Sequence, residues 1–292
     1  MLRARTCHDC PVNTPTLITV AATGAETPKS AAPGLPVTLA ELVATAKACE
    51  AAGAALIHVH IRDGAGEPTL DLGQLRETVA ALRTETDLIV QLSTGGAVTD
   101  PYAARIAVLE ADPDSCSLTC GTVNFGTEVF MNPWPFMVEL YRETQARQIV
   151  PEFELFDYGH VTALNRLLDK EGSPFGGHVH CDLVLGVPGG MPGTAVALLA
   201  AVAQLPAGAS WSATGIGRTA LPVALAALAA GGHLRVGMED TLTMAPGQPV
   251  RDNEELVTRA ATLATLAQRP PMTTAAARSL LNVKTRTVEG RP

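Results

Sequence analysis

Short runs of β-branched and other apolar residues alternate with longer alanine- and leucine-rich segments along nearly the whole chain. The short runs are typical of strands, and the longer segments have apolar positions at helical spacing. The predicted strands span residues 17–23, 55–62, 88–94, 115–121, 150–157, 178–186, 210–217 and 234–240. The predicted helices span residues 39–52, 72–86, 101–111, 134–148, 161–170, 194–205, 221–230 and 253–269.

This alternation predicts an α/β fold, a single-domain (β/α)8 TIM barrel. Eight strands that are each followed by a helix, in a chain of 292 residues, match that architecture. We expect the barrel to span residues 16–284, with an N-terminal extension at 1–15 and a C-terminal tail at 285–292. A doubly wound open sheet fits less well, because residues 22–25 lack the G-x-G-x-x-G spacing of a phosphate-binding turn.

Composition and charge narrow the range of partners. Hydrophobic residues make up 47% of the chain, enough for a large core, and the net charge of −8 argues against a nucleic-acid partner. No run approaches the roughly 18 apolar residues of a membrane span, and no signal-peptide core follows the first five residues. We therefore expect a cytoplasmic protein with no membrane partner and with reduced cysteines. Cys7 and Cys10 have C-x-x-C spacing, but without a second pair they are expected in an exposed tail.

Two histidines near the end of the second predicted strand are candidate metal ligands. His58, His60 and Arg62 are two residues apart, so they share one face of the strand, while the apolar residues between them share the other. Catalytic zinc usually takes three protein ligands and leaves one position open. The pair therefore needs a third ligand from elsewhere in the chain.

The eighth predicted strand ends in two adjacent carboxylates that can complete such a site. In a closed barrel the second and eighth strands flank the first, and active sites lie at the C-terminal ends of the strands. We expect Glu239 as the third metal ligand, Asp240 as a base beside the metal, and Arg235 as the residue that orients this base. Glu26 follows the end of the first strand and is expected nearby.

Motifs distributed along the chain carry a family resemblance. They are, in order, AATGAE at 21–26, HVHIRD at 58–63, STGG at 93–96, PEFE at 151–154, LGVPGGM at 185–191, Trp211 with GIGR at 215–218, and GGHLRVGMED at 231–240. With these motifs the chain resembles the β-keto acid cleavage enzyme family from about residue 17 to about residue 283.

The resemblance implies a fold, a cofactor and a reaction. Members of this family are TIM barrels that bind a divalent metal, usually zinc, and condense a β-keto acid with acetyl-CoA to give acetoacetate and a new acyl-CoA. The resemblance also implies a homo-oligomer, with a tetramer expected. The small-molecule partners would be the β-keto acid and the CoA thioester.

Roles for individual residues follow from the same resemblance. It implies His58, His60 and Glu239 as metal ligands, Asp240 as the base, Arg235 as its partner and Glu26 as a polar residue of the catalytic pocket. The remaining matched positions bind substrate. They are Ser93 or its neighbour Thr94, together with Thr119, for the substrate carboxylate, and Glu154 or Glu152 for the far end of the substrate.

Independently of the resemblance, the candidate metal ligands and the candidate carboxylate base are residue types that suit this reaction. A metal that chelates a β-keto acid stabilises negative charge on oxygen as the α-proton leaves. A carboxylate base needs its proton affinity tuned by burial and by a nearby charge, and Asp240 has Glu239 and Arg235 close in sequence.

The identity of the substrate tail stays open at this point. A buried Glu152 or Glu154 would favour a cationic or hydroxylic tail, because a buried carboxylate needs a partner. His178 and His180 repeat the His-x-His spacing on the sixth predicted strand, and if protonated they would suit an anionic tail. Structural contacts and a second metal site are alternatives for this pair. Arg218 has either a cofactor or pocket role or a place in a structural ion pair.

Two other functions are compatible with a His-x-His barrel. An amidohydrolase-type zinc hydrolase would carry that pair on its first strand and further histidines on the fifth and sixth strands. Here another strand precedes the pair, and the fifth strand offers glutamates. A non-catalytic metal-binding barrel would have no need of Asp240 and Arg235.

Overall fold

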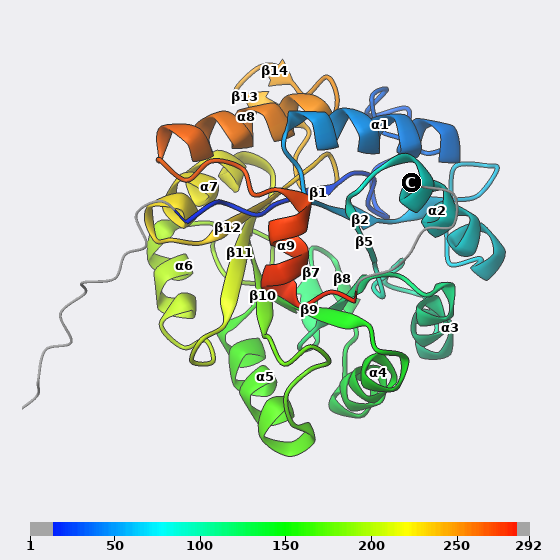
Figure 1. Cartoon of the computed structure of the whole chain (residues 1–292), viewed down its shortest axis with the longest axis vertical. Helices are drawn as coiled ribbons and strands as arrows, with labels where there is room; N and C mark the ends of the chain where they lie inside the picture. Colours follow the sequence, from blue (N-terminus) through cyan, green and yellow to red (C-terminus); the bar gives the residue numbers. More distant parts are fainter. Residues whose placement is uncertain (1–13, 285–292) are drawn as a thin grey trace, which may run out of the picture.

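The fold is a closed parallel barrel surrounded by helices (Figure 1), in a computed structural model that describes residues 14–284. The barrel order is β1-β12-β11-β10-β9-β6-β5-β2, and all eight strands run parallel. The strands are β1 Ile18–Ala21, β2 Leu56–Val59, β5 Ile89–Leu92, β6 Ser115–Thr119, β9 Val150–Leu155, β10 His180–Leu185, β11 Ser210–Gly215 and β12 His233–Val236. The predicted TIM barrel is confirmed.

Helices form a ring outside the barrel (Figure 1). They are α1 Leu39–Ala52, α2 Leu72–Glu85, α3 Tyr102–Ala107, α4 Trp134–Arg147, α5 Tyr158–Glu171, α6 Ala195–Val202, α7 Ala220–Ala229 and α8 Asn253–Leu266. Short 3-10 turns follow α3 at Val108–Ala111 (η1) and precede α7 at Gly217–Thr219 (η2). No helix within residues 14–284 is long and apolar enough to cross a membrane.

Local sequence signals explain where these elements begin and how they pack. Thr38 and Glu41 form a capping box at the start of α1, so two backbone N–H groups that lack helical partners are satisfied. Outward-facing strand residues such as Ile57 and Val59 pack in one large cluster with helix residues such as Val79. The α1 bounds agree with the prediction, while α8 ends three residues earlier than expected.

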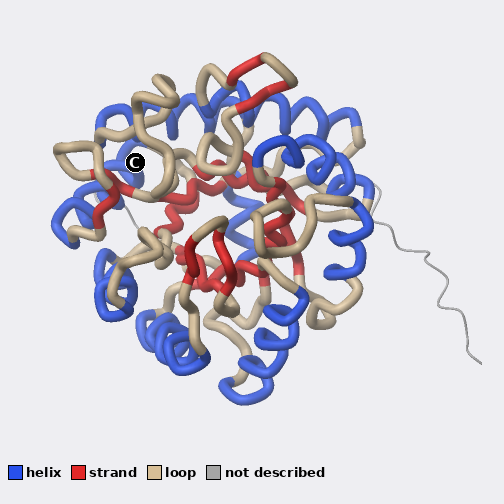
Figure 2. Tube along the Cα trace, turned by 180° about the vertical axis from the view of Figure 1, so that it is seen from behind, coloured by secondary structure: helices blue, strands red, loops and turns tan. Residues whose placement is uncertain are grey.

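The strands are shorter than predicted, and after β2, β6 and β12 the chain forms three small hairpins outside the barrel. They are β3 Ile61–Arg62 with β4 Pro68–Thr69, β7 Val123–Phe125 with β8 Glu128–Phe130, and β13 Thr243–Ala245 with β14 Gln248–Pro249. His60 therefore lies between β2 and β3 and not within one continuous strand. Seen from behind, the β7–β8 hairpin lies in front of the barrel opening (Figure 2).

A ninth helix, α9 (Thr274–Leu281), closes the other end of the barrel (Figure 1). Ala277 and Leu281 pack against residues at or before the strand starts, among them Leu56 and Ile89. The sequence pattern did not predict this helix. The Cys7–Cys10 motif lies outside the described residues.

Leu281→Ala should lower the free energy of unfolding by about 2–5 kcal/mol, because Leu281 is only 2% exposed and the truncation leaves a cavity under the barrel. Urea denaturation checks this value. Leu266→Ala on α8 is the matched control, since Leu266 is 75% exposed and its loss should change stability by no more than about 0.5 kcal/mol. Equal effects in both variants would contradict the role of α9 as a packed cover.

Candidate active site

A cavity of about 270 Å³ lies at the C-terminal ends of the barrel strands, opposite α9. Residues that end or follow the strands line it, including Thr23 after β1, Ser93 after β5 and Phe156 after β9. TIM-barrel active sites are built at this end from the strand ends and the following loops. The cavity is therefore the candidate active site.

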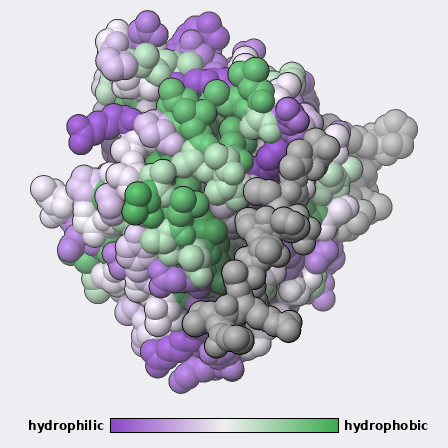
Figure 3. All heavy atoms as spheres, turned by 90° about the vertical axis from the view of Figure 1, so that its left-hand side faces the viewer, coloured by the Kyte–Doolittle hydropathy of each residue, from purple (hydrophilic) through white to green (hydrophobic). Residues whose placement is uncertain are grey.

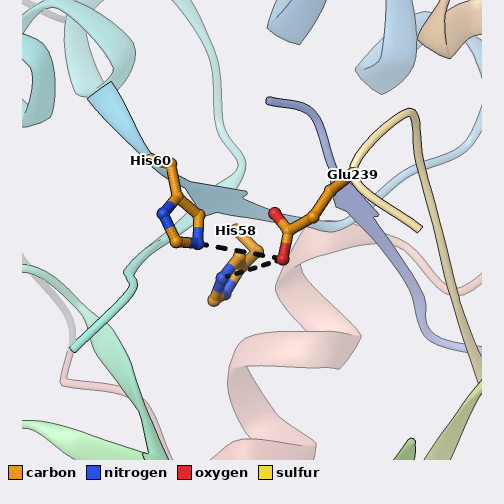
Figure 4. A group of neighbouring side chains, drawn as sticks. All are labelled: His58, His60 and Glu239. Atoms are coloured by element: carbon orange, nitrogen blue, oxygen red, sulfur yellow. Dashed lines mark ion pairs between the residues drawn. The ribbon is translucent and has the colours of Figure 1, made fainter. Parts of the chain in front are cut away.

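Two histidines and one glutamate converge in this cavity (Figure 4). The Nε2 atoms of His58 and His60 each lie 3.8 Å from Oε1 of Glu239. One nitrogen or oxygen atom from each of the three side chains lies within 4.8 Å of the others. His58 and His60 come from β2 and its end, and Glu239 follows β12, so the two strands that flank β1 supply the group.

The residue at position 24, shortly after β1, has to lack a side chain for the Glu239 carboxylate to reach the two histidines. Gly24 has a φ of +66°, and a Cβ built on it would lie 2.7 Å from Cγ of Glu239. The backbone N–H of Glu239 donates to the carbonyl of Ala21 at 3.2 Å. A side chain at position 24 would both strain the backbone and displace the carboxylate.

A hydrogen bond to Gln91 orients the His58 ring. Nδ1 of His58 lies 2.6 Å from Oε1 of Gln91, and Nε2 of that amide donates to Ser115 at 3.2 Å. With Nδ1–H as the donor, the lone pair of Nε2 faces Glu239. Burial lowers the pKa of His58, and it lowers the pKa of His60 to about 4, so both rings are neutral and able to bind a metal.

The buried guanidinium of Arg235 binds several carboxylates at once. Its Nε and Nη2 donate to the two oxygens of Asp240 at 3.2 and 3.0 Å. Its Nη1 donates to Oε1 of Glu154 at 3.2 Å and lies 3.9 Å from Asp182, and its Nη2 also donates to Glu239. Four carboxyl groups thus surround one guanidinium.

This grouping leaves an excess of negative charge in a buried space. Burial raises the pKa of Asp240 to about 7 and that of Asp182 to about 6, although Arg235 opposes both shifts. Burial also acts to raise the pKa of Glu239, but Arg235 and the two rings hold it at about 2. Oε2 of Glu239 is buried and has no hydrogen-bond partner in the described part of the chain. Neutral imidazoles, an ionised carboxylate and an unpartnered oxygen suit a divalent cation.

The predicted substrate-binding residues occupy different surroundings. Ser93 lines the cavity, whereas the hydroxyl of Thr94 donates to the backbone carbonyl of Ser117 at 2.7 Å. Thr119 donates to Oε2 of Glu154 at 2.7 Å. Of the residues at these positions, Ser93 and Glu154 line the cavity.

Glu152 lies one layer deeper than Glu154, in the floor of the barrel beside the second histidine pair. Its Oε2 is 3.4 Å from Nε2 of His180. His178 and His180 both contact the hydroxyl of Ser210 at 2.7 Å. Burial lowers the pKa of both rings and opposes their protonation. Neither ring lines the cavity, so this pair has no contact with a substrate bound there.

The loop after β1 brings Glu26 to the cavity. Arg62 fixes this loop, because its Nη2 donates to the carbonyls of Gly24 at 2.7 Å and Thr27 at 3.1 Å. Glu26 lines the cavity and is exposed. Arg218 lies on η2 and is exposed, outside the cavity lining.

Sequence reasoning missed several residues of the site. Asp182 is fully buried and accepts from Thr214 at 2.8 and 2.7 Å. The period of two on a strand would have paired Asp182 with His180 and Gln91 with Ser93, all facing the barrel interior. Phe125, on the β7–β8 hairpin, lines the cavity without any such signal.

Comparison with solved structures supports the fold. The structure of ObcA without ligands matches this chain with a TM-score of 0.74 and 20% identity, over 86% of this chain and 66% of that one. This chain thus spans just under two thirds of the length of ObcA.

Comparison of sequences defines the family. The model of the β-keto acid cleavage enzyme family matches residues 15–283.

A 3-keto-5-aminohexanoate cleavage enzyme of Acetoanaerobium sticklandii is 35% identical over 273 residues, which cover 91% of this chain and 98% of that enzyme. A 3-oxoadipate:acetyl-CoA acetyltransferase of Cupriavidus necator is 32% identical over 281 residues, or 95% and 98% of the two chains. A 3-dehydrocarnitine:acetyl-CoA trimethylamine transferase of Rhizobium meliloti is 33% identical over 85% and 90% of the two chains. Since the family model and these relatives span nearly the whole sequence, the chain belongs to the β-keto acid cleavage enzyme family.

Proposed function

We propose that this enzyme converts a β-keto acid and acetyl-CoA into acetoacetate and a new acyl-CoA in the cavity described above. The observation that carries the proposal is the group of His58, His60 and Glu239 next to the Asp240–Arg235 pair. The names of relatives that use acetyl-CoA support the same reaction and co-substrate.

Zinc or another divalent cation is the cofactor that this donor set suits. His58, His60 and Glu239 would hold it, and no fourth histidine, cysteine or carboxylate joins this group within residues 14–284. A bound cation would polarise the keto and carboxylate oxygens of the substrate and so make the α-proton more acidic.

Asp240 is the proposed base. Arg235 donates to both of its oxygens, so the carboxylate is held in one orientation at the cavity wall. Burial raises the pKa of the Asp240 carboxyl group, which makes the carboxylate a stronger base.

The reaction balances without a covalent bond to the protein. Asp240 takes a proton from the α-carbon of the β-keto acid, and that carbon attacks the acetyl carbonyl and expels the CoA thiolate. The thiolate then attacks the original keto carbon, and the bond between this carbon and the α-carbon breaks. The new acyl-CoA results, and the carbanion that leaves takes a proton back to become acetoacetate.

Polar residues at the cavity edge are the proposed substrate contacts. Ser93 is the member of the Ser93/Thr94 pair that lines the cavity, and it is therefore the proposed contact for the substrate carboxylate. Thr119 would act through Glu154, to which it donates. Glu26, in the loop after β1, is the proposed polar substrate contact on that side of the cavity.

A coupled assay tests the reaction. Enzyme loaded with Zn²⁺ is given acetyl-CoA and a panel of β-keto acids, and acetoacetate and the new acyl-CoA are followed by mass spectrometry. Both products should appear in equal amounts. Hydrolysis of lactones or amides without CoA would instead support the hydrolase hypothesis, and a metal-loaded protein with no turnover would support the non-catalytic one.

His60→Ala should reduce the bound metal from about one equivalent per chain to almost none, because only two ligands remain. Elemental analysis after dialysis measures this directly. His178→Gln is the matched control, since that ring lies outside the cavity lining, and it should keep the metal. Full metal content in His60→Ala would remove His60 from the ligand set.

Asp240→Asn should lower kcat by about 10²- to 10⁴-fold while the metal content stays the same, because the amide cannot accept the α-proton. Steady-state kinetics with the best substrate of the panel measures the change. Exchange of the α-proton with solvent deuterium, without acetyl-CoA, should fall by a similar factor. Exchange at the wild-type rate would contradict the role of Asp240.

We infer that copies of the chain associate through α6 and α7. These helices carry no charged residue, and their outer faces expose Val196, Leu199, Leu221 and Leu225 (Figure 3). An apolar patch of this kind is typical of an interaction site. A second copy is the proposed occupant: the chain has a net charge of −8, and contact between two uncharged faces avoids repulsion between like charges.

Replacing Leu199 and Leu225 together with Glu should convert the oligomer, expected to be a tetramer, into smaller species. Light scattering coupled to gel filtration measures the mass. Leu266→Glu on α8 adds a charge at another exposed leucine and should leave the mass unchanged. An unchanged mass in the double variant would rule out this face.

A cytoplasmic location is compatible with the cysteines. Cys49, Cys116, Cys120 and Cys181 are buried and free, as expected in a reducing compartment.

A further inference from the structure

The cavity has two chemically different sides. The groups proposed for catalysis come from β2, β12 and the loop after β1. The side formed by residues on or after β6, β9 and β10 is apolar apart from Glu154, and it consists of Phe125, Phe130, Phe156, Val184 and Val187, with Ile216 after β11 extending it towards β12. In the barrel order β9 lies four strands from β1 in either direction, so Phe156 after β9 and Glu26 after β1 lie across the barrel from each other.

Aromatic rings give the apolar side a defined shape. The Phe125 ring meets Phe130 and Phe156 edge-on, with centroid distances of 6.3 and 6.2 Å. The guanidinium carbon of Arg105 lies 4.8 Å from the centroid of the Phe130 ring, outside the cavity lining. The β7–β8 hairpin that carries Phe125 is bound to the loop after β10, because the N–H of Gly126 donates to the carbonyl of Pro188 at 3.0 Å. The apolar side is therefore part of the folded structure.

Two charged residues of the cavity lining near this side, Glu154 and Arg235, are bound to each other. Glu154 uses both carboxylate oxygens, since Arg235 donates to one at 3.2 Å and Thr119 to the other at 2.7 Å. Arg235 is in turn held by Asp240 and Glu239. A charged tail packed against the phenyl rings and aliphatic side chains of this side would lose its hydration without gaining a partner among them, which is costly.

We propose that the substrate is a β-keto acid with an uncharged, apolar tail that packs against Phe125, Phe156 and Val184. This inference rests on the proposed function. A substrate whose keto and carboxylate groups bind near His58 and Glu239 extends its tail towards the opposite wall. The three relatives described above are named for substrates that carry an amino group, a second carboxylate or a trimethylamine group, so this chain would differ from those three in specificity.

Matched pairs of substrates isolate the effect of charge. The first pair is 5-amino-3-oxohexanoate and 5-methyl-3-oxohexanoate, which differ by an ammonium group in place of a methyl. The second pair carries a trimethylammonium or a tert-butyl group at the end of the same chain. 3-Oxoadipate provides an anionic tail, and straight-chain 3-oxo acids of increasing length measure the apolar contribution. Each is assayed with the Zn²⁺-loaded wild-type enzyme and saturating acetyl-CoA.

The neutral member of each pair should have a kcat/KM at least about 100-fold higher than the charged member. Across the straight-chain series kcat/KM should rise by about fourfold per methylene until the cavity is full. Calorimetry with the corresponding 3-hydroxy acids, which lack the keto group and do not react, should give the same ranking of affinities.

Each other outcome has its own meaning. Faster turnover of the ammonium or carboxylate member overturns the apolar-tail proposal and leaves the reaction intact. Preference for trimethylammonium over tert-butyl assigns the three rings to cation binding and also overturns it. Absence of acetoacetate with every substrate overturns the proposed function instead.

Phe125→Ala distinguishes binding of the β-keto acid tail from binding of acetyl-CoA. The variant should lose at least about tenfold in kcat/KM for apolar tails while the KM for acetyl-CoA stays the same, because the ring contacts the β-keto acid alone. Val129→Ala is the control on the same hairpin, since Val129 is 46% exposed and lies outside the cavity lining. A higher KM for acetyl-CoA with an unchanged tail preference would assign the apolar side to the CoA arm and overturn the proposal.

Discussion

The buried Arg235 guanidinium is the contact on which the rest of the site depends. Without it, four largely buried carboxyl groups would face one another with no opposite charge between them. With it, Glu154 on β9, Asp182 on β10 and the two carboxylates after β12 are joined across the barrel. One cation does not neutralise four anions, so the remaining negative charge makes the site suitable for a further cation beside Glu239. Structural cohesion and suitability for a cation thus come from the same set of charges.

The barrel order explains how one cavity separates two tasks. The strands around β1 supply imidazole and carboxylate groups, and the loops after β6, β9, β10 and β11 supply phenyl rings and aliphatic side chains. Because β6, β9 and β10 lie three or four strands from β1, the apolar residues that follow these strands can change without disturbing the residues around β1. Relatives with similar sequences that are named for different substrates are what such a separation would produce.

The sequence predicted the barrel and singled out several residues that lie around His58, His60 and Glu239, but it did not predict how deep in the barrel each candidate lies. The alternation of strand and helix repeats eight times, so an error of a few residues in the predicted bounds of one element does not change the predicted fold. Glu152 and Glu154 share one face by the period of two, and which of them reaches the cavity depends on the tilt of β9 in the closed barrel. Ser93 and Thr94 face opposite sides, so which of the two lines the cavity depends on where β5 ends. The hairpins of two or three residues per strand and the cover helix α9 lie outside the repeat and have no comparable signal.

The cover formed by α9 has a kinetic consequence. With the floor closed by Leu281 and its neighbours, substrates and products share the opening at the other end of the barrel. The two reactants differ greatly in size and enter through the same opening. If the bulky thioester bound first, it would obstruct the path of the smaller acid, so the order of binding cannot be random. The enzyme should therefore follow a compulsory order, in which the acid binds before the thioester and the larger product departs before acetoacetate.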